Sequence, residues 1–313
     1  MSKSYDPMLD QAYRGRTAPE LLEAPVDALK GVSSMGAKKL ADAFPIERLR
    51  DLAEWKFAER ARAIRAATGV PGFDPGPPSA WEAFFHDAPL AHYQSHPDRF
   101  RLPFGPVYYR GRLDDTARVV VVGQDPATDE ILAHRTFVGF SGQRVQGFLR
   151  KLGLTRSYVM MNTFLIGVFG QFDSELRAIS LEAPILDYRN GFLTGLSDRN
   201  PVEAVIAVGG GARHAIEQWP GRDDVPVFQI QHPAALDEAP LLATWNEALL
   251  NLAEVVEPDD DGTTDLTPYG SAFTEEDNED IPRFDLPFGV PDWQGRGPHS
   301  VRDGDKKIIW TAP

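Results

Sequence analysis

The stretch VVVVGQDPATDE, residues 119–130, decides the fold. Its run of valines indicates a strand buried on both faces, because a strand with one solvent-exposed face alternates apolar and polar residues. The run ends in Gly-Gln-Asp-Pro at residues 123–126, so the strand delivers a carboxylate to the edge of a sheet. In open parallel sheets, ligands bind at the edge where the carboxyl ends of the strands meet. The stretch therefore predicts a buried parallel strand that leads into a ligand site.

Three further strands are expected downstream, separated by segments with helical periodicity. The four expected strands are residues 117–123, 158–164, 201–211 and 225–233. A helix is expected over 141–153, with Ser141 as a possible N-cap, and another over 240–256. Strands that are joined by helical crossovers run parallel. The sequence therefore predicts an α/β fold with a four-stranded parallel sheet flanked by helices.

The chain is expected to have a helical N-terminal region, residues 1–75, before an α/β domain at 76–256. The Pro/Gly-rich segment 71–81 indicates the boundary between them. Residues 29–44 have the layout of a helix-hairpin-helix, which offers backbone N–H groups to phosphates. The usual Gly-apolar-Gly core of that motif is absent, so a plain structural pair of helices is the favoured interpretation.

The region 257–313 is expected to be an acidic linker followed by a C-terminal segment that packs back on the domain. Residues 257–265 and 274–280 are acidic and poor in apolar groups, which predicts solvated, disordered chain. Residues 281–293 and 308–310 are too apolar for a free tail and are expected to pack on the α/β domain.

Composition excludes some classes of site and leaves DNA binding open. The chain of 313 residues has no cysteine, which excludes disulfides, thiolate-held iron–sulfur clusters and cysteine zinc sites. The net charge is −14, but residues 257–313 carry 14 acidic and 5 basic residues, so the rest of the chain is only −5. Residues 131–172 contain no acid and five bases: Arg135, Arg144, Arg150, Lys151 and Arg156. This stretch favours a phosphate-binding face, with a solvated helix face as the alternative.

No apolar run is long enough to span a bilayer, and the first residues lack the apolar core of a secretory leader. A cytoplasmic protein without a membrane partner is expected.

Polar residues gather at the carboxyl ends of all four expected strands. They are Gln124 and Asp125, then Asn162, then Gly209–Gly211, then His232. Because these ends share one edge of a parallel sheet, one active site built from four turns is expected. Bland alternatives stay open: a turn residue or N-cap for Asp125, a strand-end cap for His232, and core positions for Asn162 and Phe137.

Four motifs at these strand ends resemble the uracil-DNA glycosylase superfamily, over residues 117–256. They are GQDP (123–126), HRTFVGFSGQ (134–143), MNTF (161–164) and QHPAAL (231–236). The second motif is similar to the branch of the family that carries an iron–sulfur cluster. The chain departs from both well-known branches, because Ala127 and Thr128 follow the first motif in place of Tyr-His and no cysteine can hold a cluster. It is identified as an atypical, metal-free member.

The resemblance implies a role for each matching residue. Asp125 would orient water and His232 would stabilise the leaving base. Gln124, Phe137, Asn162 and His232 would contact a flipped uracil, and Ala127 and Thr128 would form the pocket wall. Contacts to DNA are expected from Ser141, Arg144, Gly210 and Leu236, the last as a wedge in the duplex.

The implied activity is hydrolysis of the N-glycosidic bond of uracil in DNA after base flipping, by a monomer that needs no cofactor or metal. Rival functions are a weakly catalytic binder of damaged or abasic DNA, a mismatch glycosylase that also accepts thymine, and a nucleotide hydrolase on a Rossmann-like sheet. Metal dependence would favour the hydrolase. The GGGARH segment at 209–214 is interpreted as a loop that allows close backbone approach. His86, His92 and His96 are interpreted as surface histidines without a metal.

Overall fold

The computed structural model describes residues 9–57 and 72–287, and the chain divides into two compact units at Gly72 and Phe73. The expected segments 288–293 and 308–310 lie outside the described residues. Among those described, no helix has the length and apolar character needed to cross a membrane.

The first unit is built from short helices. They are α1 (Ala18–Leu22), α2 (Ser34–Ala43) and α3 (Leu49–Ala53), with a 3-10 helix at Val26–Ala28. Gly31 turns the chain into α2 with φ +93°, a conformation that favours glycine. The Ser33 side chain then accepts a hydrogen bond from the Gly36 N–H at 3.1 Å and caps α2. The segment 29–44 is thus a turn followed by a single capped helix.

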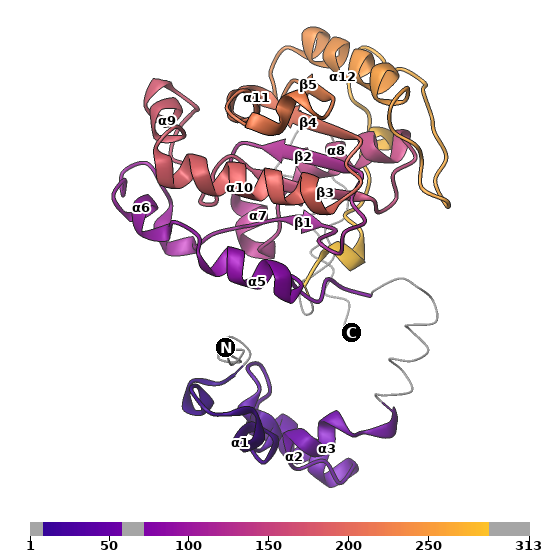
Figure 1. The fold of residues 1–313 in the computed structure, drawn as a ribbon. Coiled ribbons are helices and arrows are strands. Elements are labelled where there is room, and N and C mark those ends of the chain that lie inside the picture. The colour runs from indigo at the N-terminus through magenta and orange to yellow at the C-terminus, as the bar shows by residue number, and fades with distance from the viewer. Residues whose placement is uncertain (1–8, 58–71, 288–313) are drawn as a thin grey trace. The chain divides into compact units, whose positions relative to one another are not determined.

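The second unit contains a five-stranded sheet in the order β1-β3-β2-β4-β5 (Figure 1). Its strands are β1 (Arg110–Gly111), β2 (Val119–Gly123), β3 (Tyr158–Asn162), β4 (Ala204–Val208) and β5 (Val227–Ile230). Strands β2 to β5 are mutually parallel, and β1 pairs antiparallel with β3 at the edge. The predicted α/β class with four parallel strands is confirmed. The fifth strand was missed because two residues are too few to leave a periodic pattern.

Helices cover both faces of the sheet. They are α5 (Ser79–His86), α6 (Leu90–Gln94), α7 (Thr128–Ala133), α8 (Phe140–Lys151), α9 (Ser174–Ile179), α10 (Ala183–Arg199), α11 (Gly209–Glu217) and α12 (Glu238–Leu252). The expected cap at Ser141 is wrong, because α8 begins at Phe140 with Gly139 as its N-cap. Ser141 instead lies in the first turn of α8.

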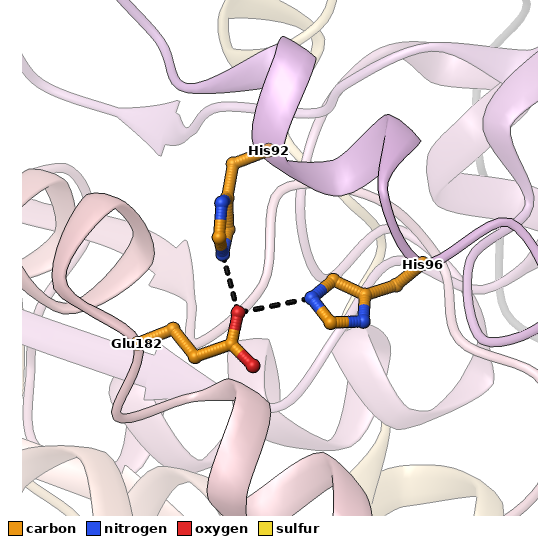
Figure 2. A group of neighbouring side chains, drawn as sticks. All are labelled: His92, His96 and Glu182. Atoms are coloured by element: carbon orange, nitrogen blue, oxygen red, sulfur yellow. Dashed lines mark hydrogen bonds and ion pairs between the residues drawn. The ribbon is translucent and has the colours of Figure 1, made fainter.

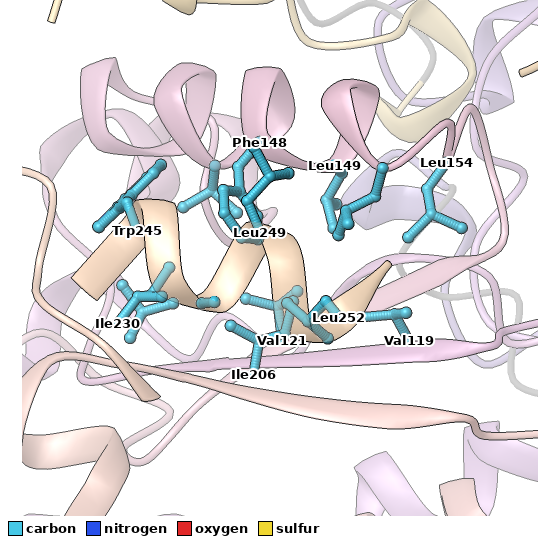
Figure 3. Packing of buried hydrophobic residues seen from close by; sticks show 14 of the residues in the cluster. Val119, Val121, Phe148, Leu149, Leu154, Ile206, Ile230, Trp245, Leu249 and Leu252 are labelled. Carbon is cyan, nitrogen blue, oxygen red and sulfur yellow. The ribbon is translucent and has the colours of Figure 1, made fainter. Parts of the chain in front are cut away.

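The valine run of β2 packs in both directions, as its composition predicts. Val119 and Val121 belong to a cluster with α8 and α12, in which Phe148 and Trp245 meet edge to face at 5.2 Å (Figure 3). The alternate residues of β2 pack on the opposite side against α5, α10 and α11. Full burial of one such side chain stabilises the fold by about 1.5–3 kcal/mol. These two apolar layers fix β2 at the centre of the domain.

The C-terminal segment, residues 257–287, contacts the domain, so the expectation of a disordered acidic part is wrong, while most residues of 257–265 and 274–280 are exposed to solvent as expected. Tyr269 and Phe273 pack against Trp245, with ring centroids 5.7 and 5.0 Å away. Asp285 is fully buried and accepts hydrogen bonds from Arg110 and Tyr158 at 3.0 and 2.8 Å. These contacts anchor the segment through both apolar packing and a buried ion pair.

The basic stretch of residues 135–156 is neutralised by partners that are distant in sequence. Four of its cations form ion pairs, namely Arg135 with Asp74, Arg150 with Glu279, Lys151 with Asp265 and Arg156 with Asp261. Three of these acids belong to the C-terminal segment. The local positive field expected from the sequence is therefore internally balanced, which removes it as an argument for a phosphate-binding face.

Candidate active site

The carboxyl ends of the parallel strands enclose a pocket of about 650 Å³. It lies at the point where the chain order of the strands reverses, because β2 has β3 on one side and β4 on the other. Such a switch point is the usual ligand site of an open α/β sheet. The predicted residues that line the pocket are Gln124, Asp125, Ala127, Thr128, Phe137, Ser141, Asn162, Gly210 and His232.

Asp125 is held at the pocket by two hydrogen-bond donors. Its Oδ2 accepts from the Val168 N–H at 2.9 Å and its Oδ1 accepts from the Gln124 side-chain amide at 2.8 Å. Burial raises the pKa of Asp125, and these two bonds and the charge of Arg101 only partly offset the effect. No Lys or Arg forms an ion pair with Asp125 among the described residues. The carboxylate is thus oriented while its charge stays available to a ligand or a water molecule.

Asn162 faces the same pocket from the end of β3. The register pairs Gly123 with Asn162, which sets the amide beside the start of the Gln-Asp turn. Asn162 is 5% exposed, and its side chain makes no hydrogen bond to another described residue. The amide atoms of Asn162 are not among the buried atoms without a partner, so they open to the pocket, where water or a ligand can form their hydrogen bonds. This is the arrangement expected of a group that recognises a ligand.

Phe137 lines the pocket close to Asn162, and its backbone conformation is strained. Its φ is +53°, which is rare for an aromatic residue. A Cβ added to Gly123 would lie 2.6 Å from the Phe137 ring and 2.4 Å from the Asn162 Oδ1. Glycine at position 123 therefore keeps open the space between the ring and the amide.

His232 stands on the opposite side of the pocket, after β5. Its Nδ1 accepts a hydrogen bond from the Ala234 N–H at 3.2 Å, so in the neutral ring the proton is on Nε2. Partial loss of hydration in the pocket lowers the pKa of His232 and favours this neutral form, but His232 is an exposed residue, so solvent limits the effect. The expected loop at 209–214 is wrong, because these residues form the start of α11. Gly209, with φ +82°, still allows the backbone there to approach the His232 side chain closely. The site thus presents a neutral N–H donor opposite Asp125 and Asn162.

The comparison with known families agrees with this geometry. A model of the uracil DNA glycosylase superfamily matches residues 110–252, which include β1 to β5 and the nine predicted residues that line the pocket. Residues 110–252 are a uracil-DNA glycosylase superfamily domain. No curated protein sequence matches the chain.

Membership of this superfamily supports a glycosylase-type hydrolase that acts on DNA. The domain contains no cysteine, so it cannot hold an iron–sulfur cluster through thiolates.

Two expected DNA contacts of the glycosylase domain do not line the pocket. Arg144 is 4% exposed; its guanidinium donates to the Pro233 carbonyl and stacks on the rings of Phe140 and Phe273 at 4.2 Å. It cannot reach a phosphate from this position, and it instead fixes the loop that carries His232. Leu236 is fully exposed on the same loop, where it is free to contact another molecule.

Sequence reasoning missed several residues of the pocket, among them the polar side chains of Glu130 and Gln171. Glu130 in α7 is 8% exposed, and its carboxylate accepts from the N–H groups of Ala127 and Gly139 at 3.2 and 3.3 Å. Burial raises the pKa of Glu130, partly offset by these bonds. Gln171 lines the pocket from the loop after β3. The position of Glu130, three residues after Ala127 at a helix start, was the available signal for its capping role.

Proposed function

We propose that this protein is a monofunctional uracil-DNA glycosylase. The observation that carries the proposal is the convergence of Asp125, Asn162, Phe137 and His232 on one pocket within a domain of the matching superfamily. A flipped uracil stacks on the Phe137 ring, and the Asn162 amide donates to O4 and accepts from N3–H. Cytosine presents the opposite donor and acceptor at these positions, so the amide discriminates between the two bases.

The chemistry follows from where charge develops. Cleavage of the bond between C1′ and N1 leaves the electron pair on the uracil ring and a cationic sugar. The Nε2–H of His232 donates to the O2 carbonyl that gains charge, and the Asp125 carboxylate lies beside the cation. Asp125 also accepts a hydrogen bond from water, whose oxygen bonds to C1′ while its proton leaves through the carboxylate. The products are free uracil and an abasic site.

DNA docks, in this proposal, over the mouth of the pocket. The backbone N–H groups at the starts of α8 and α11, beside Ser141 and Gly210, face the rim and suit phosphate oxygens. Leu236 fills the gap that the flipped nucleotide leaves. Arg144 does not contact phosphate in this proposal; it supports the loop that carries His232.

The decisive experiment uses end-labelled oligonucleotides with one uracil, as single strand and as duplex opposite guanine or adenine. We expect release of free uracil and strand breaks that form only after alkali treatment. Breaks without alkali would identify a nuclease if no uracil is released, and a glycosylase with an added lyase activity if uracil is released. Tight binding to an abasic oligonucleotide, with no uracil released from any of these substrates, would replace the proposal with a damaged-DNA binder.

Selectivity against thymine is assigned, within this proposal, to Glu130. Ala127 and Thr128 are exposed and carry little bulk, whereas the Glu130 carboxylate is buried beside the Ala127 backbone. We expect wild type to excise uracil from U·G duplexes roughly 10–200-fold faster than thymine from T·G, the usual worth of one carbon group in a shaped pocket. The Glu130→Ala variant should lower the ratio of uracil to thymine excision rates. Glu130→Gln keeps the shape of the side chain and should leave this ratio unchanged. Equal wild-type excision of both bases would make the protein a mismatch glycosylase.

A further inference from the structure

Two histidines and a glutamate converge on the side of the domain that carries α6 and the start of α10 (Figure 2). His92 lies in α6, His96 follows on the next turn, and Glu182 is the N-cap of α10. The His96 Nε2 lies 2.9 Å from the Glu182 Oε2, and the His92 Nε2 contacts the same oxygen. One ligand atom from each of the three residues lies within 4.8 Å of the others.

The interpretation of these histidines as isolated surface residues holds for His86, whose side chain is 90% exposed. His92 and His96 are also partly exposed, at 27% and 24%, but each contacts a carboxylate that the sequence pattern did not reveal. Glu182 lies 90 residues from His92 in the chain, so no local spacing links the two. Only the packing of α10 against α6 brings the carboxylate to the imidazoles.

We propose that His92, His96 and Glu182 form a site for a divalent transition-metal ion, for which Zn²⁺ is the best match. His92 lies in α6 and His96 lies just beyond the end of that helix, yet both Nε2 atoms point to the Glu182 carboxylate, which completes a His₂Glu set. Zn²⁺ binds such nitrogen and oxygen ligands at about 2.0–2.2 Å, so in tetrahedral geometry neighbouring ligand atoms lie roughly 3.4 Å apart. Both imidazole nitrogens lie within hydrogen-bonding distance of the Glu182 Oε2, so each must move away from it by roughly 0.5–1 Å to admit the ion.

The surroundings suit a cation. The ion pairs that Glu182 makes with other described residues are to these two histidines, so no Lys or Arg in that part of the chain occupies the carboxylate. All three side chains keep an exposed edge, which leaves room for water as a fourth ligand.

The site is structural and independent of the proposed glycosylase chemistry. The chain after His96 continues into residues 99–101, which pair with residues 167–169 through N–H bonds of 2.8 and 2.9 Å. Within that pair, the Val168 N–H is the donor that holds the Asp125 carboxylate. An ion that ties α6 to α10 therefore stabilises the segment that positions Asp125, without touching the reacting atoms.

The test uses the full chain, stripped with a chelator, dialysed, and titrated with Zn²⁺ against a chromophoric competitor. We expect the wild type to bind about one equivalent, and its thermal midpoint to rise with Zn²⁺. The control His86→Ala should behave as wild type. His92→Ala should weaken binding by more than about 100-fold, because loss of a direct ligand exceeds the 10–100-fold effect of an outer-shell change.

Glu182→Gln guards against misfolding, because it keeps the size and one hydrogen-bond acceptor while it removes the charge. It should retain the wild-type circular dichroism spectrum and lose Zn²⁺ affinity. Co²⁺ in place of Zn²⁺ should give the visible absorption of a four-coordinate ion with wild type and with His86→Ala, and not with His92→Ala. Equal Zn²⁺ affinity of wild type and His92→Ala, or no tight equivalent in wild type, would overturn the proposal.

Discussion

The pocket at the strand ends and the C-terminal segment each hold an aspartate, and they treat its carboxylate in opposite ways. Asp125 has two hydrogen-bond donors, and burial dominates and raises its pKa. Asp259 is also partly buried, but it accepts from the backbone N–H groups of residues 155–157 and from Arg118, which lower its pKa well below the usual range. The charge of Asp125 is therefore only partly stabilised by the pocket, whereas the charge of Asp259 is fully stabilised by its hydrogen bonds.

The same contrast separates the pocket from the basic stretch of residues 135–156. The cations of that stretch end in ion pairs or, for Arg144, on a carbonyl and two aromatic rings. The side-chain amide of Asn162, by comparison, lines the pocket and forms no hydrogen bond with the other described residues. Polar groups whose partners are supplied by the fold stabilise it, whereas groups left without partners are where a ligand can gain free energy.

The largest effect is expected from the C-terminal segment. Asp285→Asn removes the charge that faces Arg110, whose side chain is fully buried, and Arg112. Breaking a buried ion pair from one side costs about 3–5 kcal/mol, because the other charge stays buried and uncompensated. Urea unfolding should show a loss of this size, while the excision rate per folded molecule stays near that of wild type. Asp261→Asn, at a side chain 63% exposed, is the control; a loss for Asp285→Asn no larger than the control's would show that the segment is not anchored there.

Asp125→Asn should reverse that pattern by affecting the rate and not the fold. An electrostatic group at a developing charge is worth roughly 2.7–4 kcal/mol, or about 10²–10³ in the single-turnover rate. Asn still accepts from the Val168 N–H, so DNA binding should be nearly unchanged.

Stability provides a second measurement on this variant. Because the folded-state pKa of Asp125 is raised, its stabilising contribution is present at low pH and lost as pH rises through that pKa. At pH 7 the ionised group therefore opposes folding, and Asp125→Asn should be at least as stable as wild type. A rate within a few-fold of wild type would remove Asp125 from the mechanism.

Asp259→Asn, the same change in the other region, should destabilise at neutral pH by about 1.5–3 kcal/mol, the usual value of hydrogen bonds to a charged group. The folded-state pKa of Asp259 is lowered, so its contribution is present above its unfolded pKa, about 3.9, and lost as pH falls below it. The stability gap to wild type should therefore shrink in urea titrations between pH 5 and about pH 3. A gap that is independent of pH would assign the effect to packing and not to charge.

The sequence predicted the parts of this molecule that depend on local pattern. The valine run, the strand-end polar residues and the helical spacers predicted the parallel sheet and brought nine candidate residues to one pocket. It could not predict features that depend on chain segments meeting across long separations. Arg144 has the composition of a phosphate contact, and only the fold shows its guanidinium buried under Pro233. The positive φ of Phe137 leaves no local signature either.

The prediction of disorder for the acidic C-terminal segment was wrong for a related reason. A charge run predicts disorder when its partners are water, and here the partners are Arg150, Lys151 and Arg156 on another part of the chain. Opposite net charges of two segments in one sequence were the available signal that they pair.

The smallest effect is expected from breaking the ion pairs between the basic stretch and the C-terminal segment. Arg150 and Arg156 are partly exposed, with side chains 55% and 37% accessible, and both already face an acid of the C-terminal segment. Exposed ion pairs contribute about 0–1 kcal/mol, so the variant carrying Arg150→Gln and Arg156→Gln should lose little stability.

If these cations also bound DNA phosphates, each would contribute about 0.9 to the slope of log affinity against log salt concentration. We expect no such change in fluorescence-anisotropy titrations of a uracil-containing duplex between 50 and 200 mM salt. Leu236→Ala, measured beside it, should weaken binding without changing the slope, because a wedge carries no charge. A slope reduced by nearly two units in the double variant would restore the basic stretch as a DNA-binding face, and the ion pairs with the C-terminal segment would then compete with DNA.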